Sequence, residues 1–375
     1  MAAPDHGVPN PLLRIQDLHV RFATRHGMLH AVRGVSLSIG KGERVGVVGE
    51  SGSGKSVTAH SILRLMPQAR TEGRIWLDDT DLLSLPPAGL RRIRGNRIGM
   101  VFQDPMTALN PVLTIGRQVV EAGRHRGLGR KEARDQAVSL LGSLGIPHPA
   151  RRFDDYPHHF SGGMRQRVII AAALMGDPDL LIADEPTTAL DVRLQARLLD
   201  MLWTLSEERK MSVLLISHDL ALVAGFAERV AVMYSGVVQE SAPVDELFGA
   251  PAHPYTTGLL RSAPRLDAYA REPLQPIPGS PPSPVARPAG CRFAPRCHRA
   301  QQICTQTEPA LVTLEHAAGH TSACHFAEQV RAETVTTGGA ASASGPHDRG
   351  GGPGGDLVGS RQPAGPTGRN DDHRP

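Results

Sequence analysis

The chain has 375 residues and a formal net charge of +4, with 40% hydrophobic and 21% charged residues. These proportions are ordinary for a globular protein, and so small a net charge gives no indication of nucleic-acid binding. No apolar run approaches the ~18 residues of a membrane helix, and residues 1–11 lack the features of a secretory signal. We therefore expect a cytoplasmic protein that acts at a membrane only through partners.

Alternating and continuous apolar runs predict a sheet in the first half of the chain. Residues 12–22 and 29–39 alternate apolar with polar side chains, which is typical of paired antiparallel strands. Residues 45–48 are wholly apolar and predict a buried strand, followed by a glycine-rich loop and a helix over about 55–65. Further buried strands are expected at residues 97–102, 180–184, 212–217 and 229–234. Strands alternating with helices indicate an α/β fold with a mostly parallel sheet.

The rest of the chain divides by composition. Residues 114–175 show mainly helical periodicity, which predicts a helical subdomain inserted into the sheet domain. Residues 251–330 are rich first in proline and then in cysteine, and we interpret them as an appended extension. In residues 336–375 Gly, Ser, Pro and Ala dominate, so this tail cannot bury enough apolar surface to fold and is expected to be disordered.

A phosphate-binding motif follows the strand predicted at residues 45–48. Residues 49–56, GESGSGKS, fit the pattern G-x-x-x-x-G-K-[ST] between a strand and a helix. The loop amides and the helix N-terminus would face the phosphates of ATP, Lys55 would reach the β- and γ-phosphates, and Ser56 would bind Mg²⁺. The alternative is a glycine-rich turn with an incidental lysine. The expected nucleotide-binding residues of the motif are Gly49, Ser51, Gly52, Gly54, Lys55 and Ser56.

Polar side chains follow three more of the predicted strands. Asp184 and Glu185 come at the end of an apolar run, at the sheet edge where α/β proteins bind ligands. We expect Asp184 to hold Mg²⁺ and Glu185 to act as general base on the attacking water, against the alternative of an acidic strand end in solvent. His218 is a candidate for stabilising charge on the γ-phosphate, and Gln103 for contacting metal and water. For a lone histidine, a capping or solvated position is the alternative.

Residues 160–167, FSGGMRQR, resemble the signature motif of ABC ATPases. Together with the P-loop, Gln103, Asp184-Glu185, His218 and residues 188–191 (TALD), they follow the motif order of that family over about residues 12–250. The resemblance implies a P-loop NTPase fold of ABC type, with an antiparallel β subdomain and a helical subdomain. It also implies ATP hydrolysis with Mg²⁺ as cofactor.

In the family arrangement the signature motif completes the ATP site of a second ATPase subunit. Ser161, Gly162 and Gly163 would form an anion site at the start of a helix over residues 164–175. Asp191 would lie in a loop at the dimer contact, and two ATP molecules would be held head to tail. Adenine usually stacks on an aromatic residue before the P-loop, for which Phe22 is the best candidate. A strand-pairing phenylalanine is the alternative.

Two further segments resemble the oligopeptide, dipeptide and nickel importer branch of the family. Residues 253–255 (HPY) resemble the start of its C-terminal extension, and residues 104–111 (DPMTALNP) resemble the segment that grips its membrane subunits. The resemblance implies the motor of a bacterial peptide importer at the cytoplasmic face of the cell membrane. Its partners would be a second ATPase, as a heterodimer, two transmembrane permease subunits and, indirectly, an extracytoplasmic peptide-binding protein. A nickel importer, a soluble ABC ATPase without a transport role and an exporter subunit are the alternatives.

All four cysteines lie in the predicted extension. In a reducing cytoplasm such clustering favours metal binding over disulfides. Their spacings of five, six and 19 intervening residues differ from the C-x₂-C pairs of zinc sites, whereas four thiolates fit a [4Fe–4S] cluster, as the family resemblance also implies. Zinc or reduced thiols are the alternatives. The sequence does not place these residues near ATP, so the expected role is structural or regulatory. The predicted ligands are Cys291, Cys297, Cys304 and Cys324.

Overall fold

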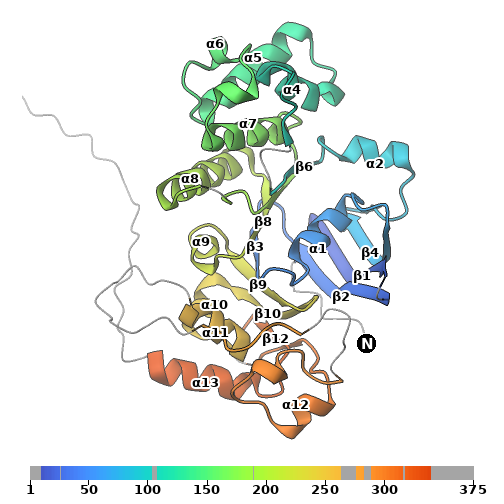
Figure 1. The fold of residues 1–375 in the computed structure, drawn as a ribbon, viewed down its shortest axis with the longest axis vertical. Helices are drawn as coiled ribbons and strands as arrows, with labels where there is room; N and C mark the ends of the chain where they lie inside the picture. Colours follow the sequence, from blue (N-terminus) through green and yellow to red (C-terminus); the bar gives the residue numbers. More distant parts are fainter. Residues whose placement is uncertain are drawn as a thin grey trace, which may run out of the picture.

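Two β-sheets, a group of helices and a C-terminal extension make up the chain (Figure 1). The computed structural model describes residues 10–25, 27–103, 108–188, 190–262, 276–282, 289–315 and 317–338. Much of the predicted membrane-subunit segment, at residues 104–107, lies outside this range, as do residues 339–375 of the predicted tail. The α/β fold expected from the sequence is confirmed, with helices beside a largely parallel sheet.

The smaller sheet is antiparallel and has the strand order β2-β1-β4-β5. The predicted pair is present, and each of its strands is slightly longer than the sequence indicated. One face packs on the larger sheet through fully buried side chains such as Leu13, Leu18 and Ile39. Burial of each such side chain stabilises the fold by about 1.5–3 kcal/mol. The strands are β1 (Leu13–Thr24), β2 (Gly27–Ile39), β4 (Ala69–Leu77) and β5 (Thr80–Asp81).

The larger sheet has the order β11-β12-β10-β9-β3-β8-β7-β6 and is parallel from β9 to β6. Its parallel strands are buried on both faces, which explains their continuous apolar runs. Because they are parallel, the loops after β3, β6, β7 and β8 emerge at one edge. The strands are β3 (Arg44–Val48), β6 (Ile98–Val101), β7 (Leu180–Asp184), β8 (Ser212–Ser217), β9 (Arg229–Tyr234), β10 (Val237–Pro243), β11 (Val312–Thr313) and β12 (Thr321–Ser322).

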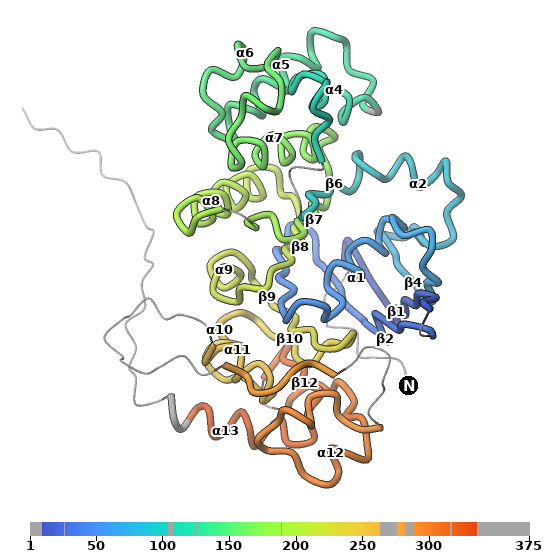
Figure 2. Tube along the Cα trace, viewed as in Figure 1, coloured from blue at the N-terminus to red at the C-terminus, as the bar shows by residue number. Residues whose placement is uncertain are grey.

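Helices between β6 and β7 form a separate group, drawn at the top of Figures 1 and 2. Within it, α7 (Gly162–Leu174) starts two residues earlier than predicted because Ser161 caps it. The others in the group are α4 (Ile115–Ala122), α5 (Arg130–Ser143) and α6 (Pro149–Arg152). Helices outside the group are α1 (Lys55–Ile62), which ends three residues before the predicted end, α2 (Pro87–Ile93), α8 (Val192–Arg209), α9 (Leu220–Ala224) and α10 (Val244–Gly249).

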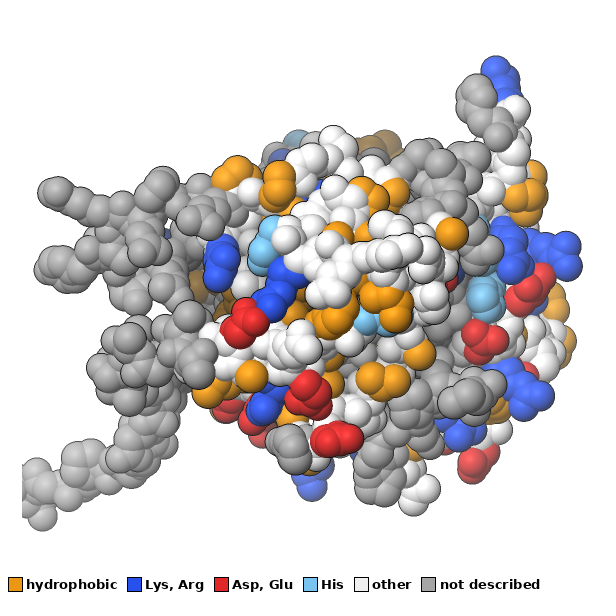
Figure 3. Space-filling model, turned by 90° about the horizontal axis from the view of Figure 1, so that it is seen from below, with side chains coloured by type: hydrophobic (Ala, Val, Ile, Leu, Met, Phe, Trp, Pro, Cys, Tyr) orange, Lys and Arg blue, Asp and Glu red, His pale blue; other side chains and the backbone are white. Residues whose placement is uncertain are grey.

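The C-terminal extension is attached to the larger sheet, because β12 pairs with β10. At this junction the Nε2 atom of His320 lies 2.7 Å from Oε1 of Glu240, and both side chains are fully buried. The last helix continues to Gly338, so the expected disordered tail does not begin at residue 336. Charged side chains of both signs are interspersed over the face that the extension presents (Figure 3). Its helices are α11 (Pro254–Ser262), α12 (Gln302–Gln306) and α13 (Ala327–Gly338).

Within the described ranges, no helix is both long enough and apolar enough to serve as a membrane span.

Candidate ATP site

The P-loop and the loops after neighbouring strands meet at one pocket of about 470 Å³. The P-loop lies between β3 and α1, as the motif predicts. Its glycines are required by the backbone: a Cβ atom on Gly49 would lie 2.1 Å from the carbonyl oxygen of Met233, and one on Gly54 2.8 Å from that of Ala31. Both glycines also have positive φ angles, which L-residues rarely adopt. The predicted residues lining this pocket are Phe22, Ser51, Gly52, Gly54, Lys55, Ser56, Gln103 and Glu185.

The amino group of Lys55 is buried inside the P-loop. Its Nζ donates to the carbonyl oxygens of Gly49, at 2.7 Å, and Glu50, at 3.0 Å. Burial lowers the pKa of Lys55, although the carboxylates of Glu185, Asp184 and Glu50 act in the opposite direction. A buried ammonium group of this kind is stabilised by an added anion, so the geometry fits the binding of a polyphosphate.

The side chain of Asp184 connects the larger sheet to α1. Its Oδ1 accepts a hydrogen bond of 2.9 Å from Oγ of Ser56, so the two predicted magnesium ligands lie together. Its Oδ2 lies 3.2 Å from Nε2 of His60, a residue that the sequence analysis missed. His60 follows Ser56 by four residues on the same helix and therefore shares its face. That spacing is the sequence signal by which His60 could have been found. The carboxylate and hydroxyl oxygens are ligands that Mg²⁺ prefers.

Three side chains converge on one oxygen of Glu185. Its Oε2 accepts hydrogen bonds from Nε2 of Gln103, at 2.8 Å, and Oγ1 of Thr188, at 3.2 Å, and it lies 3.4 Å from Nδ1 of His218. The Glu185 side chain is 13% exposed, whereas that of His218 is 63% exposed. Glu185 also has φ 47°, in the left-handed region, where a non-glycine residue is strained. The fold therefore holds this carboxylate in a defined position at the edge of the pocket.

Apolar side chains form another part of the pocket wall. Phe22 on β1 lies opposite Leu29 on β2, and both line the pocket. Phe22 therefore pairs with the neighbouring strand and also lines the pocket. Pro281 and Pro282, which belong to the C-terminal extension, also line the pocket. No pattern in the sequence had indicated this contribution to the pocket.

Comparison with known proteins shows which family combines these features. The profile described as "ABC transporter" matches residues 32–188, and the one described as "Oligopeptide/dipeptide transporter, C-terminal region" matches residues 239–304. The dipeptide transport ATP-binding protein DppD of Bacillus subtilis is 48% identical over 331 residues, which cover 87% of this chain and 98% of DppD. The chain belongs to the ABC transporter family. It is an ABC-type ATPase, and the pocket described above is its candidate ATP site.

Two further comparisons agree with this assignment. The oligopeptide transport ATP-binding protein OppD of Bacillus subtilis is 46% identical over 304 residues, 80% of this chain and 85% of OppD. Among solved structures, the dimeric ATP-binding cassette MJ0796 in a post-hydrolysis state with ADP and Pi is 29% identical with a TM-score of 0.57. It covers 62% of this chain, and the match spans 98% of that cassette.

The residues of the ABC signature motif do not line the pocket of their own chain. Oγ of Ser161 accepts from the backbone N–H of Met164, at 3.4 Å, and caps α7. Asp191 caps α8 in the same way, through a 2.9 Å bond from the N–H of Leu194 to its Oδ1. The first turns of α7 and α8 are neighbours, because a Cβ atom on Gly163 of α7 would lie 3.6 Å from the side chain of Leu194 of α8. Gly162 is the first residue of α7, and a Cβ there would contact none of the described residues.

The extension makes direct contact with the P-loop, although the sequence did not place its cysteines near ATP. Both carboxylate oxygens of Glu50 accept hydrogen bonds from Arg296, at 2.8 and 3.0 Å. The backbone N–H of Glu50 donates to the hydroxyl of Tyr255, at 2.9 Å. Tyr255 belongs to the His-Pro-Tyr element, and Arg296 precedes Cys297. These contacts join residues about 200 or more positions apart, so no local pattern could have revealed them.

All four cysteines line one small apolar cavity in the extension. They are free thiols, and none is exposed. Burial raises the pKa of Cys291 and Cys297, and raises that of Cys324 to about 11, and the neighbouring thiols add to each effect. In the part of the chain that the structure describes, no three or more His, Cys, Asp or Glu residues are arranged to hold a metal ion. The predicted convergence of the cysteines is present, without the geometry of a single-ion site.

Proposed function

We propose that this chain is the ATP-hydrolysing motor of a bacterial importer of dipeptides or oligopeptides. The observation that carries the proposal is the union of an ABC-type ATP site with an oligopeptide/dipeptide-type extension that contacts its P-loop. The names of DppD and OppD support the substrate class. Peptide uptake by membrane vesicles that contain the complex built around this chain tests the proposal, and nickel uptake is the alternative outcome.

We propose the following roles at the ATP site. Lys55 and the P-loop amides bind the β- and γ-phosphates, and Ser56 and Asp184 hold Mg²⁺, which neutralises charge on the phosphates. Glu185 accepts a proton from the attacking water as the new oxygen–phosphorus bond forms and the bond from the γ-phosphorus to the β–γ bridging oxygen breaks. Gln103 orients the Glu185 carboxylate through its 2.8 Å hydrogen bond. His218 stabilises negative charge on the γ-phosphate, and Phe22 stacks on adenine.

We propose that the active unit contains two ATPase subunits, two transmembrane permease subunits and, at the other side of the membrane, a peptide-binding protein. Ser161, Gly162 and Gly163 do not line their own pocket, which supports a role for them, with Asp191, at the ATP of a second subunit. Phe102 and Val112, which flank residues 104–107, are exposed apolar side chains suited to a permease contact. This chain and a second, different ATPase subunit would form a heterodimer at the cytoplasmic face of the membrane. Mass spectrometry of the purified complex identifies its subunits.

The four cysteines are proposed to hold a [4Fe–4S] cluster. Four soft thiol ligands around one apolar cavity fit such a group, and a cluster of four irons holds its thiolates farther apart than a single ion does. When bound, the cluster would stabilise the fold of the extension. Each cysteine would bind iron as a thiolate, and the cavity walls would exclude water from the iron–sulfur bonds.

Chain purified without oxygen is therefore expected to be brown, and Cys324→Ser to lose most of the visible absorbance. Ser322→Ala, a change two residues away that keeps every thiol, is the matched control and should keep the colour. A colourless wild-type chain that contains one equivalent of zinc by metal analysis would rule out the cluster.

A further inference from the structure

The guanidinium group of Arg296, in the extension, forms hydrogen bonds both to the P-loop and to another part of the extension. Arg296 lies in the short turn Ala294–Arg296, and its side chain is 5% exposed. Nη1 and Nη2 each donate to one carboxylate oxygen of Glu50, and Nη1 also lies 3.3 Å from the hydroxyl of Tyr234. Such a bidentate pair between arginine and a carboxylate is stronger and more directional than a single hydrogen bond. The hydrogen bonds to Glu50 raise the pKa of Arg296, so its positive charge is permanent.

Through Glu50 this pair reaches the residue that is proposed to bind phosphate. Glu50 is the second residue of the P-loop, and its carbonyl oxygen accepts a hydrogen bond from Nζ of Lys55. Its N–H is held by the hydroxyl of Tyr255, also from the extension. The side chain, the N–H and the carbonyl of Glu50 are thus all engaged. A change at Arg296 would free the Glu50 side chain next to Lys55.

The same guanidinium also holds part of the pocket wall. Nε of Arg296 donates to the carbonyl oxygen of Pro278, at 2.9 Å, and Nη2 to that of Ile277, at 3.3 Å. Ile277 packs against the main hydrophobic core. This stretch continues to Pro281 and Pro282, which line the nucleotide pocket. Every nitrogen of one buried side chain is therefore used to fix either the P-loop or the segment that leads to this wall.

We propose that Arg296 is a positioning residue of the ATP site, which makes nucleotide affinity depend on the docked extension. It orders Glu50 and the Pro281–Pro282 wall before ATP arrives, so part of the ordering cost of binding is removed. Arg296 does not line the nucleotide pocket, so its effect is expected on binding rather than on the chemical step. Because Arg296 directly precedes Cys297, a structural change at the cysteine cavity can thereby alter the affinity of the chain for ATP.

The test is ATP titration of the full-length chain, together with steady-state hydrolysis. Arg296→Met should raise the Kd for ATP and the KM about tenfold or more, because a buried charge-assisted pair is lost. At saturating ATP the kcat should stay within about twofold of the wild type. Arg296→Lys keeps the charge without the planar fork, so it should restore only part of the affinity. Unchanged Kd in Arg296→Met would overturn the proposal.

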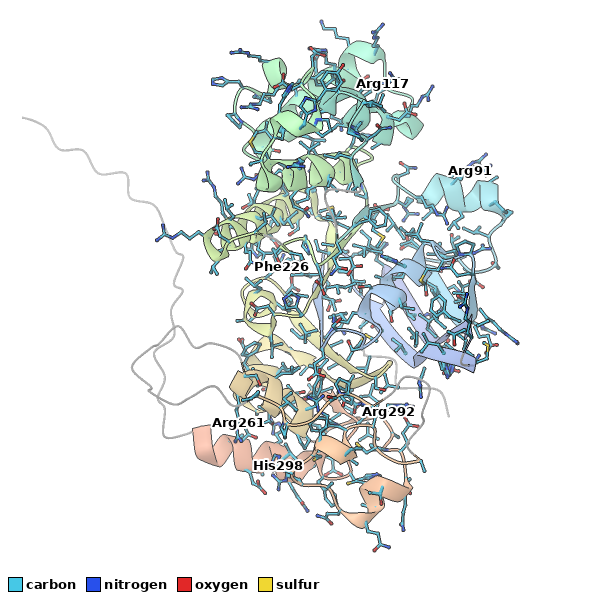
Figure 4. All side chains as sticks on the ribbon, in the orientation of Figure 1. Arg91, Arg117, Phe226, Arg261, Arg292 and His298 are labelled. Atoms are coloured by element: carbon cyan, nitrogen blue, oxygen red, sulfur yellow. The ribbon has the colours of Figure 1, made fainter. Side chains whose placement is uncertain are left out.

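Two further variants separate positioning from a general loss of structure. Glu50→Ala removes the acceptor of the same pair. If both residues act through this pair, the double variant with Arg296→Met should have a Kd for ATP no higher than the higher of the two single-variant values. Glu50 lies outside the extension, so this arm stays informative even if Arg296→Met fails to fold. Arg292→Met is the matched control, because Arg292 (labelled in Figure 4) is equally buried in the same loop but pairs with Glu308. Equal loss of affinity in Arg292→Met would show that any damage to the extension suffices and would refute the specific role.

Discussion

Replacing Glu185 with Gln is expected to lower ATP turnover by roughly 100-fold to 10,000-fold, the contribution typical of a general base. The amide keeps the shape of the side chain and can still lie near Gln103 and His218, but it cannot take a proton from water. ATP binding should be retained, because Glu185 is not proposed to hold the phosphates. Phosphate release and equilibrium ATP binding, measured on the same preparation, check both statements.

A second glutamate provides the control for this change. Glu207→Gln alters a half-exposed residue on α8 that pairs with Arg44 and does not line the pocket, and it should leave turnover within about twofold of the wild type. Near-normal hydrolysis by Glu185→Gln would contradict the assignment of the general base. Loss of ATP binding in that variant would instead show that Glu185 supports the structure of the pocket.

Lys55→Ala is expected to weaken ATP binding by roughly 10-fold to 150-fold. Hydrogen bonds to a charged group contribute about 1.5–3 kcal/mol, which corresponds to that range of Kd. The buried amine lies among the P-loop carbonyls, where a polyphosphate would supply the counter-charge that its surroundings provide only in part. Titration of the full-length chain with ATP and Mg²⁺ measures the effect.

Lys41→Ala is the matched control for that prediction. Lys41 is 70% exposed, pairs with Asp78 and precedes β3, whereas Lys55 follows the other end of the same strand. Its removal changes the net charge of the chain by the same amount and should leave the Kd for ATP unchanged. An unaltered Kd in Lys55→Ala, or an equal loss in both variants, would refute the phosphate-binding role of Lys55.

Sequence reasoning located the alternating strands β1 and β2 and the strands that are buried on both faces, and it missed β10, a buried strand that carries polar residues. The predicted ranges 180–184, 212–217 and 229–234 coincide with β7, β8 and β9, because continuous apolar runs require burial on both sides. Strand β10 is buried but contains Gln239, Glu240 and Ser241, so its pattern does not look like a core strand. Its backbone pairs with β12, and Oε1 of Glu240 pairs with His320, about 80 residues later in the chain.

In the candidate site too, residues with a local sequence pattern were found and a contact made by long-range packing was not. Asp184, Glu185, Gln103 and His218 were predictable because each follows an apolar run and parallel strands bring such positions to one edge. His60 had a signal in its helical spacing from Ser56. The contact between Glu50 and Arg296 had none, since it depends on how the extension docks on the larger sheet. Long-range docking of this kind is decided by tertiary packing and leaves no local periodicity.

Transport by the purified complex tests the central proposal most directly. The complex is captured through this chain from solubilised membranes, its subunits are identified by mass spectrometry, and it is placed in vesicles with its peptide-binding protein. We predict that the complex contains two permease subunits and that the vesicles accumulate a labelled dipeptide or oligopeptide when ATP is supplied. The same complex carrying Glu185→Gln should accumulate almost none. Accumulation of nickel without peptide, or capture of ribosomes or nucleic acid in place of permeases, would contradict the proposed function.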